Sequence, residues 1–339
     1  MLRWWKIVCI ILLTYTILVG LLLPLSPGIT DVTSSGVNKG SITEISVSGY
    51  NSHFLQGEKS LKAWVKGESE RYCCENIKAI DDQHLSAKVS IPSSTKHYSF
   101  DLIVNDDVDG TIYFANSIHL NSALTNDTSK TPAAINACTF DVKNEKAGFR
   151  SFPNREMLIE TIRNLYFHVP IWFAMITMVL ISIVYSIRYL STEQLQFDHI
   201  AEEAVRVGIM FGILGLVTGS IWAKFTWGTW WTNDTKLNGA AATMLVYFAY
   251  ILLRNSMDDE MKRARIAAVY NIFAFTLMIV FLAIIPRITD SLHPGNGGNP
   301  AFSKYDLDNT MRMVFYPAVI GWVLLSVWIL NIRIRIRKL

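Results

Sequence analysis

The sequence predicts an all-α membrane protein: a bundle of six transmembrane helices with an extracytoplasmic β-sandwich domain inserted after the first helix. Apolar residues make up 51% of the 339 residues and charged residues only 17%, below the roughly 25% of an ordinary soluble domain. Six apolar stretches approach the roughly 20 residues that cross a bilayer. A polar stretch with a different periodicity separates the first of them from the others.

The six stretches define three domains. We expect residues 1–26 to form the first helix, 27–155 the insert and 156–339 a five-helix membrane domain. The first stretch is longer than the roughly 7–15 apolar residues of a signal-peptide core and lacks a small-x-small cleavage site, so we read it as a retained helix. The expected spans are 5–26, 166–187, 207–222, 237–253, 266–285 and 313–332.

The insert has the signature of β-strands. Apolar and polar residues alternate in "ITEISVSGY", "LSAKVSI", "YSFDLIVN" and "TIYFANSIHL", the period of a half-buried strand. The acidic run "NDDVDG" lies between two of these strands, and we read it as a hairpin turn and not as a calcium loop.

Cysteine spacing indicates at most one disulfide. Cys9 falls in the first span, and Cys73, Cys74 and Cys138 fall in the insert. Adjacent residues on a strand point to opposite faces, so only one of Cys73 and Cys74 can easily meet Cys138. These spacings do not match a zinc site.

Positive charge sets the orientation. With the N-terminus in the cytoplasm, twelve Lys and Arg residues of the short loops and termini are cytoplasmic and five lie outside. The excess predicts that both termini are cytoplasmic and that the insert is extracytoplasmic. A net charge of +3 without a basic stripe argues against a nucleic-acid partner. Because no nucleophile is paired with an activating base, we do not expect an enzyme.

This topology brings three separated segments to the outer face. They are "NLYFHVP" with His168, "WGTWWTND" at 227–234, and "PRITDSLHPGNGGN" with His293. If 227–234 formed a short surface helix, Trp227, Trp230, Trp231 and Asp234 would stand at i, i+3, i+4 and i+7 on one side. Trp222, at the end of the third span, would extend this apolar shelf.

An indole shelf beside two histidines suits haem, a flat apolar macrocycle whose iron accepts imidazole on both faces. Arg163, Arg287 and Arg312 are near the same face, and a guanidinium can pair with a haem propionate. Each group also has a plainer interpretation. The tryptophans and arginines could be interfacial anchors, the histidines could be ordinary helix-end or turn residues, and Asp234 could cap the next helix.

The motifs "NLYFHVP", "GSIWAKFTWGTWWTND" and "LHPGNGG" followed by "MR" resemble, in order and topology, the haem-handling CcmC family of the cytochrome c maturation system, which carries a tryptophan-rich "WWD" signature. The resemblance covers the six spans and excludes the insert. It implies that His168 and His293 are the axial ligands of a non-covalent haem b. The tryptophan segment, residues 222–236, would then be the platform.

The same resemblance implies partners and location. Haem would be shown to a membrane-anchored haem chaperone, alongside ABC-type transporter subunits of the maturation complex and membrane lipid, in the bacterial inner membrane. The chain departs from the family in two places. Asn233 stands where the family usually has another tryptophan, and the β-rich insert replaces a short connection.

Two other functions fit parts of the sequence. A b-type cytochrome would carry electrons across the membrane, but it would usually bury its histidines inside spans and not place them at helix ends. A transporter with only an interfacial tryptophan belt would be expected to carry polar groups or broken helices near the midplane. The expected spans are largely free of these features, which favours haem handling.

Overall fold

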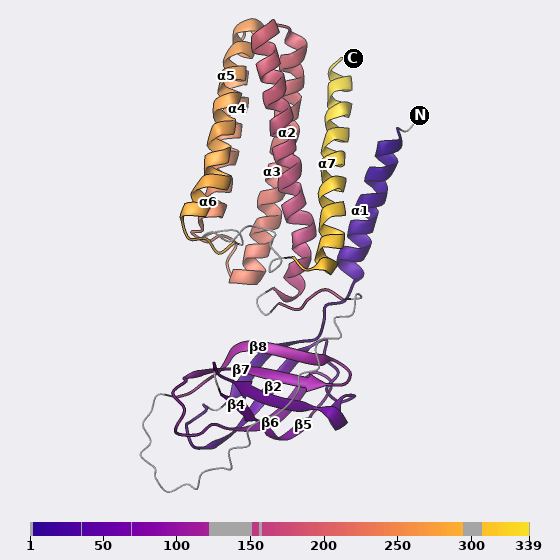
Figure 1. Ribbon diagram of the computed structural model, residues 1–339. Coiled ribbons are helices and arrows are strands. Elements are labelled where there is room, and N and C mark those ends of the chain that lie inside the picture. The colour runs from indigo at the N-terminus through magenta and orange to yellow at the C-terminus, as the bar shows by residue number, and fades with distance from the viewer. Residues whose placement is uncertain are drawn as a thin grey trace. The chain divides into compact units, whose positions relative to one another are not determined.

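The chain folds into two compact units, residues 1–23 with 160–339, and residues 24–159. The computed structural model describes residues 3–34, 36–68, 70–121, 151–155, 158–293 and 307–338 (Figure 1). Within these residues, six helices are long and apolar enough to cross a membrane, which confirms the six expected spans. The helices are α1 (Trp4–Leu22), α2 (Leu165–Thr192), α3 (Leu195–Trp227), α4 (Thr235–Asn255), α5 (Glu260–Ile279), the short α6 (Ile285–Ile288) and α7 (Asn309–Arg337).

In the first unit, α2 is the central helix, packing against α3, α5 and α7, while α1 packs on α7. The start of α1 and the end of α7 lie at the same end of this bundle, which we call the terminal end (Figure 1). The opposite end holds the start of α2, the connection 228–234 and α6, and we call it the histidine end.

Small residues allow the bundle helices to approach closely. A Cβ built on Gly212 of α3 would lie 2.3 Å from the sulfur of Met244 in α4. Buried alanines occupy similar positions on α3 and α5, including Ala204, Ala267 and Ala274. Small residues at helix interfaces are typical of membrane proteins, because association there depends on close packing and not on the hydrophobic effect.

The third span is longer than expected, since α3 covers Leu195–Trp227 and not only 207–222. Its first turns contain acidic residues that would ordinarily mark a loop, but they are buried against arginines from α4 and α7. Arg254 is only 2% exposed and binds Asp198 with two hydrogen bonds of 2.7 Å and Glu202 with one of 3.0 Å. This arginine cluster consists of Asp198, Glu202, Glu203, Arg206, Arg254, Arg333 and Arg337.

The second unit contains two antiparallel sheets, with strand orders β1-β2-β6-β5 and β4-β3-β7-β8. All four expected strand runs are confirmed, as β2, β6, β7 and β8, and "NDDVDG" forms the turn of the β7–β8 hairpin. The strands are β1 (Gly28–Ser34), β2 (Ile42–Tyr50), β3 (Lys62–Lys66), β4 (Arg71–Cys73), β5 (Glu75–Ala79), β6 (His84–Ser90), β7 (Ser99–Asp106) and β8 (Gly110–His119).

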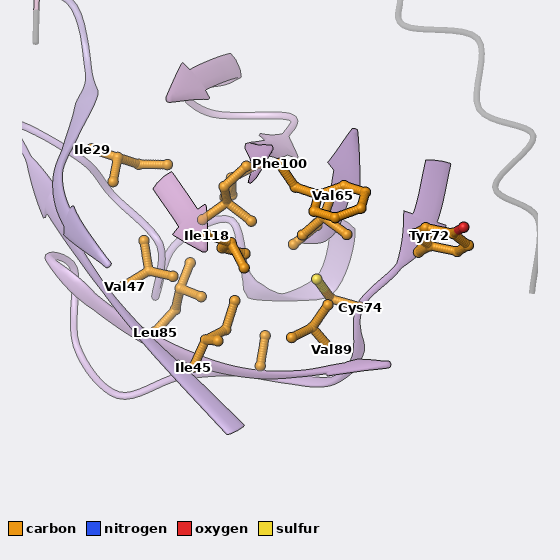
Figure 2. Packing of buried hydrophobic residues seen from close by; sticks show 14 of the residues in the cluster. Ile29, Ile45, Val47, Val65, Tyr72, Cys74, Leu85, Val89, Phe100 and Ile118 are labelled. Carbon is orange, nitrogen blue, oxygen red and sulfur yellow. The ribbon is translucent and has the colours of Figure 1, made fainter. Parts of the chain in front are cut away.

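One apolar core is shared by both sheets (Figure 2). Ile45 and Leu85 come from the first sheet, and Val65 and Phe100 come from the second. The alternation that predicted the strands is seen directly in β2, where every second residue from Thr43 to Val47 is buried. Burying the inward-facing residues of both sheets together excludes water from a single core.

The cysteines of the insert behave differently from one another. Cys73 is disulfide-bonded, as the expectation of a single bridge requires, while Cys9 and Cys74 are free. Cys138 lies outside the described residues. Cys74 packs in the core (Figure 2), and this burial raises the pKa of its thiol to about 12. It therefore remains protonated and unreactive at neutral pH.

Candidate haem-binding site

The histidine end brings together the three segments that the sequence places at one membrane face. His168 is in the first turn of α2, the tryptophan segment joins α3 to α4, and His293 follows α6. The loop that continues from His293 to residue 306 lies outside the described residues.

One imidazole nitrogen of His168 is held by α3. Its Nδ1 lies 3.0 Å from the hydroxyl of Thr218, and that hydroxyl donates to the carbonyl of Leu214 at 2.9 Å. The Thr218 oxygen is then an acceptor, so we assign the imidazole proton to Nδ1 of His168. This leaves the lone pair of Nε2 free for an electrophile.

The space around His168 depends on a glycine. A Cβ built on Gly219 would lie 2.8 Å from Cε1 of the imidazole, which is closer than real Cβ contacts. Trp222 and Trp172 also approach the ring edge to face, with centroid distances of 5.8 and 6.4 Å. The imidazole is thus packed against the backbone of α3 and between two indoles.

Asp234 holds the second imidazole and caps α4 at the same time. Its Oδ1 lies 3.0 Å from Nδ1 of His293 and accepts from the N–H groups of Lys236 and Leu237, at 2.9 and 3.2 Å. Its Oδ2 accepts from the N–H of Leu292 at 2.7 Å. A carboxylate on Nδ1 orients a histidine and leaves Nε2 as the ligand atom.

The protonation states of Asp234 and His293 agree with a role of His293 as a metal ligand. Burial lowers the pKa of His293 below its usual value, although the Asp234 carboxylate opposes the shift. Burial alone would raise the pKa of Asp234, but hydrogen bonds from Leu292 and Ser291 and the nearby His293 lower it instead. At neutral pH a neutral imidazole therefore faces an ionised carboxylate, as metal binding requires.

Residues 227–234 do not form the short surface helix that would place their side chains on one side. Trp227 is the last residue of α3, and Gly228 then takes a left-handed conformation with φ of 78° that ends the helix. Residues 228–234 form an irregular connection. The spacing i, i+3, i+4 and i+7 therefore does not place the four side chains on one helix face.

The indoles nevertheless remain at the site. The ring of Trp227 contacts His293 edge to face, with centroids 5.1 Å apart. Trp230 and Trp231 are 58% and 43% exposed, which leaves surface for a ligand or for lipid.

Arg163, Arg287 and Arg312 differ in the contacts that their guanidinium groups make. Arg163 donates to the carbonyls of Gly20 and Leu23 at 3.0 and 2.7 Å and pairs with Glu160, so it closes the end of α1. Arg287 in α6 is exposed. Arg312 in the first turn of α7 has a buried Nε without a hydrogen-bond partner in the described part of the chain.

Sequence reasoning missed Thr218, Gly219, Trp172 and Asn238. A signal existed for the first, because Thr218 precedes Trp222 by four residues and so shares its face of α3. Asn238 accepts a hydrogen bond from the Trp231 indole at 3.3 Å. No spacing rule could show this, since the two residues lie on opposite sides of a helix start.

The described residues fit a haem better than a bare metal ion. They contain no group of three or more His, Cys, Asp or Glu that could enclose a metal. They do contain two tethered imidazoles and exposed indoles, and their buried donors without a hydrogen-bond partner include Nε1 of Trp222 and Nε of Arg312. A planar, largely apolar ligand with carboxylates and an iron centre matches this set.

Comparison with known proteins identifies the family of the chain. Residues 114–339 match the family model described as "CcmC: Heme exporter protein C". The Heme exporter protein C of Escherichia coli (strain K12) is 27% identical over 199 residues, 56% of this chain and 75% of that protein. That of Bradyrhizobium diazoefficiens is 32% identical over 126 residues, 37% and 48% of the two chains. The cytochrome c biogenesis protein CcsA of Prochlorococcus marinus (strain MIT 9515) is 35% identical over 98 residues, 29% and 30%.

Proposed function

Because the chain belongs to the CcmC (Heme exporter protein C) family, we propose that it handles haem for cytochrome c maturation, holding the iron between His168 and His293. The observation that carries this proposal is the shared tethering of the two imidazoles. Each is held through Nδ1, by Thr218 or by Asp234, and each keeps Nε2 available at the same end of the bundle. Outer hydrogen bonds of this kind orient metal-binding histidines.

The other site residues take complementary roles. Trp222, Trp227, Trp230 and Trp231 would support the macrocycle. Arg312 is the strongest of the three candidates for a propionate, because its orphaned Nε would gain a partner. Arg287 is exposed and free to swing to the second propionate, whereas Arg163 would have to leave the carbonyls of α1.

The haem would be bound as haem b, without a covalent link. Covalent attachment uses cysteine thiols, and the four cysteines of the chain lie in the first helix and in the insert. A haem that is held by two iron–imidazole bonds and by contact with exposed indoles, without a covalent link, could be released again. Such a site suits delivery to a membrane-anchored haem chaperone, beside ABC-type transporter subunits.

We propose that the termini are cytoplasmic in a bacterial inner membrane, with the histidine end and the insert outside. The excess of Lys and Arg near the terminal end supports this orientation. We further propose that the insert is an immunoglobulin-like sandwich. Its strand orders correspond to strands A-B-E-D and C′-C-F-G of that fold.

Absorption spectra test the ligand assignment directly. The full chain, purified in detergent from haem-replete cells, should show oxidised and reduced spectra of a bis-histidine haem. His168→Ala and His293→Ala should each change the spectrum, and added imidazole should restore it in part. The matched control is His199→Ala, at the terminal end, which should leave the oxidised and reduced spectra unchanged. A haem-free wild type would refute the site, and unchanged spectra in both variants would refute the ligands.

Crosslinking tests the partner. A photoreactive residue in place of Trp230, which is 58% exposed, should capture the haem chaperone in cells that make cytochrome c. The same residue at Leu252, an exposed position near the other end of α4, should not. Equal capture from both positions would contradict delivery at the histidine end.

A further inference from the structure

The connection that carries Trp231 is joined to α4 by two side-chain amides. Oδ1 of Asn238, in the first turn of α4, accepts from the Trp231 indole N–H at 3.3 Å. Nδ2 of the same amide donates to Oδ1 of Asn233 at 2.7 Å. The backbone N–H of Asn238 donates to the carbonyl of Asp234 at 2.9 Å, so its place on the helix is fixed by the same residue that caps α4.

The direction of each hydrogen bond follows from the groups themselves. An indole N–H only donates, so the Asn238 amide must present its oxygen to Trp231. Its NH₂ group then points to Asn233, which must present its oxygen in turn. The three side chains therefore form a relay with a single consistent arrangement, Trp231 to Asn238 to Asn233.

We propose that this amide clip, formed by Asn233 and Asn238, is a positioning device for Trp231 and thereby raises the affinity for haem. The inference rests on the proposed function. Trp231 is 43% exposed and lies in an irregular connection, where its ring would otherwise sample several orientations. Holding the ring before the ligand arrives removes part of the ordering cost of binding.

The clip gives a role to Asn233 within the tryptophan segment. Asn233 supplies the acceptor that orients Asn238. Asn233 is thus a positioning residue, acting on haem through Asn238 and Trp231.

The test combines a haem-free and a haem-dependent measurement on the full chain in detergent. With ¹⁵N-tryptophan labelling, the Trp231 indole signal is assigned by its loss in Trp231→Phe, and its hydrogen exchange is followed without haem. Haem affinity is measured by titration with hemin. Asn238→Leu and Asn233→Leu remove the clip, Asn233→Asp keeps the acceptor, and Asn255→Leu at the other end of α4 is the control.

We expect faster indole exchange and about three- to tenfold weaker haem binding in both leucine variants, with wild-type behaviour in Asn233→Asp and Asn255→Leu. Unchanged exchange in Asn238→Leu would overturn the clip. Faster exchange with unchanged affinity would overturn its positioning role and leave the proposed function intact. A wild type that binds no hemin would refute the proposed function, and the exchange data would then still report on the clip alone.

Discussion

The two ends of the helix bundle treat polar side chains in opposite ways. At the terminal end, Arg254 is 2% exposed and is enclosed by carboxylates. At the histidine end, His168 and His293 are tied through one nitrogen each and keep the other. The first arrangement pairs the charge of Arg254 with carboxylates of the protein, although its Nε has no hydrogen-bond partner among the described residues. The second leaves one nitrogen of each imidazole for a ligand.

This difference teaches that burial and hydrogen bonding alone do not identify a functional site. Both ends have buried polar groups at helix termini, and at the histidine end two tethered imidazoles also lie against indole rings. Substitutions in the arginine cluster are therefore expected to change stability, and substitutions at the histidine end are expected to change ligand binding. The substitutions below separate the two effects.

The largest effect on stability is expected for Arg254→Met. It leaves the Asp198 carboxylate without its guanidinium partner, which should lower the free energy of unfolding by about 3–5 kcal/mol. Haem affinity of the folded fraction should not change. Chemical denaturation in detergent followed by tryptophan fluorescence measures the first quantity, and hemin titration the second.

Arg265→Met is the control for this variant. Arg265 is also paired, with Glu193, but its side chain is 64% exposed, so the loss should be at most about 1 kcal/mol. Equal losses for the two arginines would mean that the cluster is not a closed, buried network.

Asp234→Asn should, unlike Arg254→Met, weaken haem binding. Asparagine can still cap α4 through Oδ1, but its NH₂ group would meet the N–H of Leu292 that Oδ2 now accepts from, so stability should fall by about 1–3 kcal/mol. Loss of the carboxylate behind His293 should weaken haem binding about 10- to 100-fold. Hemin titration and denaturation measured on the same preparation distinguish these outcomes. Asp259→Asn, which alters the N-cap of α5 at the terminal end, should leave haem affinity unchanged.

Thr218→Val tests the tether of His168. The substitution keeps the shape of the side chain but removes the acceptor for the Nδ1 proton, so haem should bind about three- to tenfold more weakly. Thr276→Val removes a hydroxyl that bonds only to its own helix, at Ile272, and should have no effect on binding. If the two variants bind haem equally well, Thr218 does not orient the ligand.

The smallest effect is expected for Gly219→Ala. The new methyl group would meet Cε1 of His168 at 2.8 Å, and a slight rotation of the ring should relieve the contact. We expect a shifted absorption maximum with about a twofold change in affinity. Gly208→Ala on the same helix makes only contacts of 3.5 Å or more and should leave the spectrum unchanged. Identical spectra for both would show that Gly219 does not set the position of the ring.

Much of the fold was readable in the sequence, because it depends on local periodicity. All six spans are confirmed, and so are the four alternating strand runs and the acidic hairpin turn. The start of α3 was predicted too late, since Asp198 and Glu202 are polar in isolation and become buried only with their arginine partners. The surface helix considered for 227–234 does not form, because Gly228 ends α3 in a left-handed conformation.

The sequence predicts which segments form the site, but it does not predict the hydrogen bonds that join them. The direction of successive spans already predicts that His168, His293 and the tryptophan segment meet at one end of the bundle. The folded chain adds the hydrogen bonds that join different elements: those of Thr218 and Asp234 to the two Nδ1 atoms, of Arg163 to α1 and of Asn238 to Trp231. The reason is physical: hydropathy and helical period are properties of neighbours along the chain, whereas these hydrogen bonds join residues on different elements, as far apart as His168 from Thr218 and His293 from Asp234.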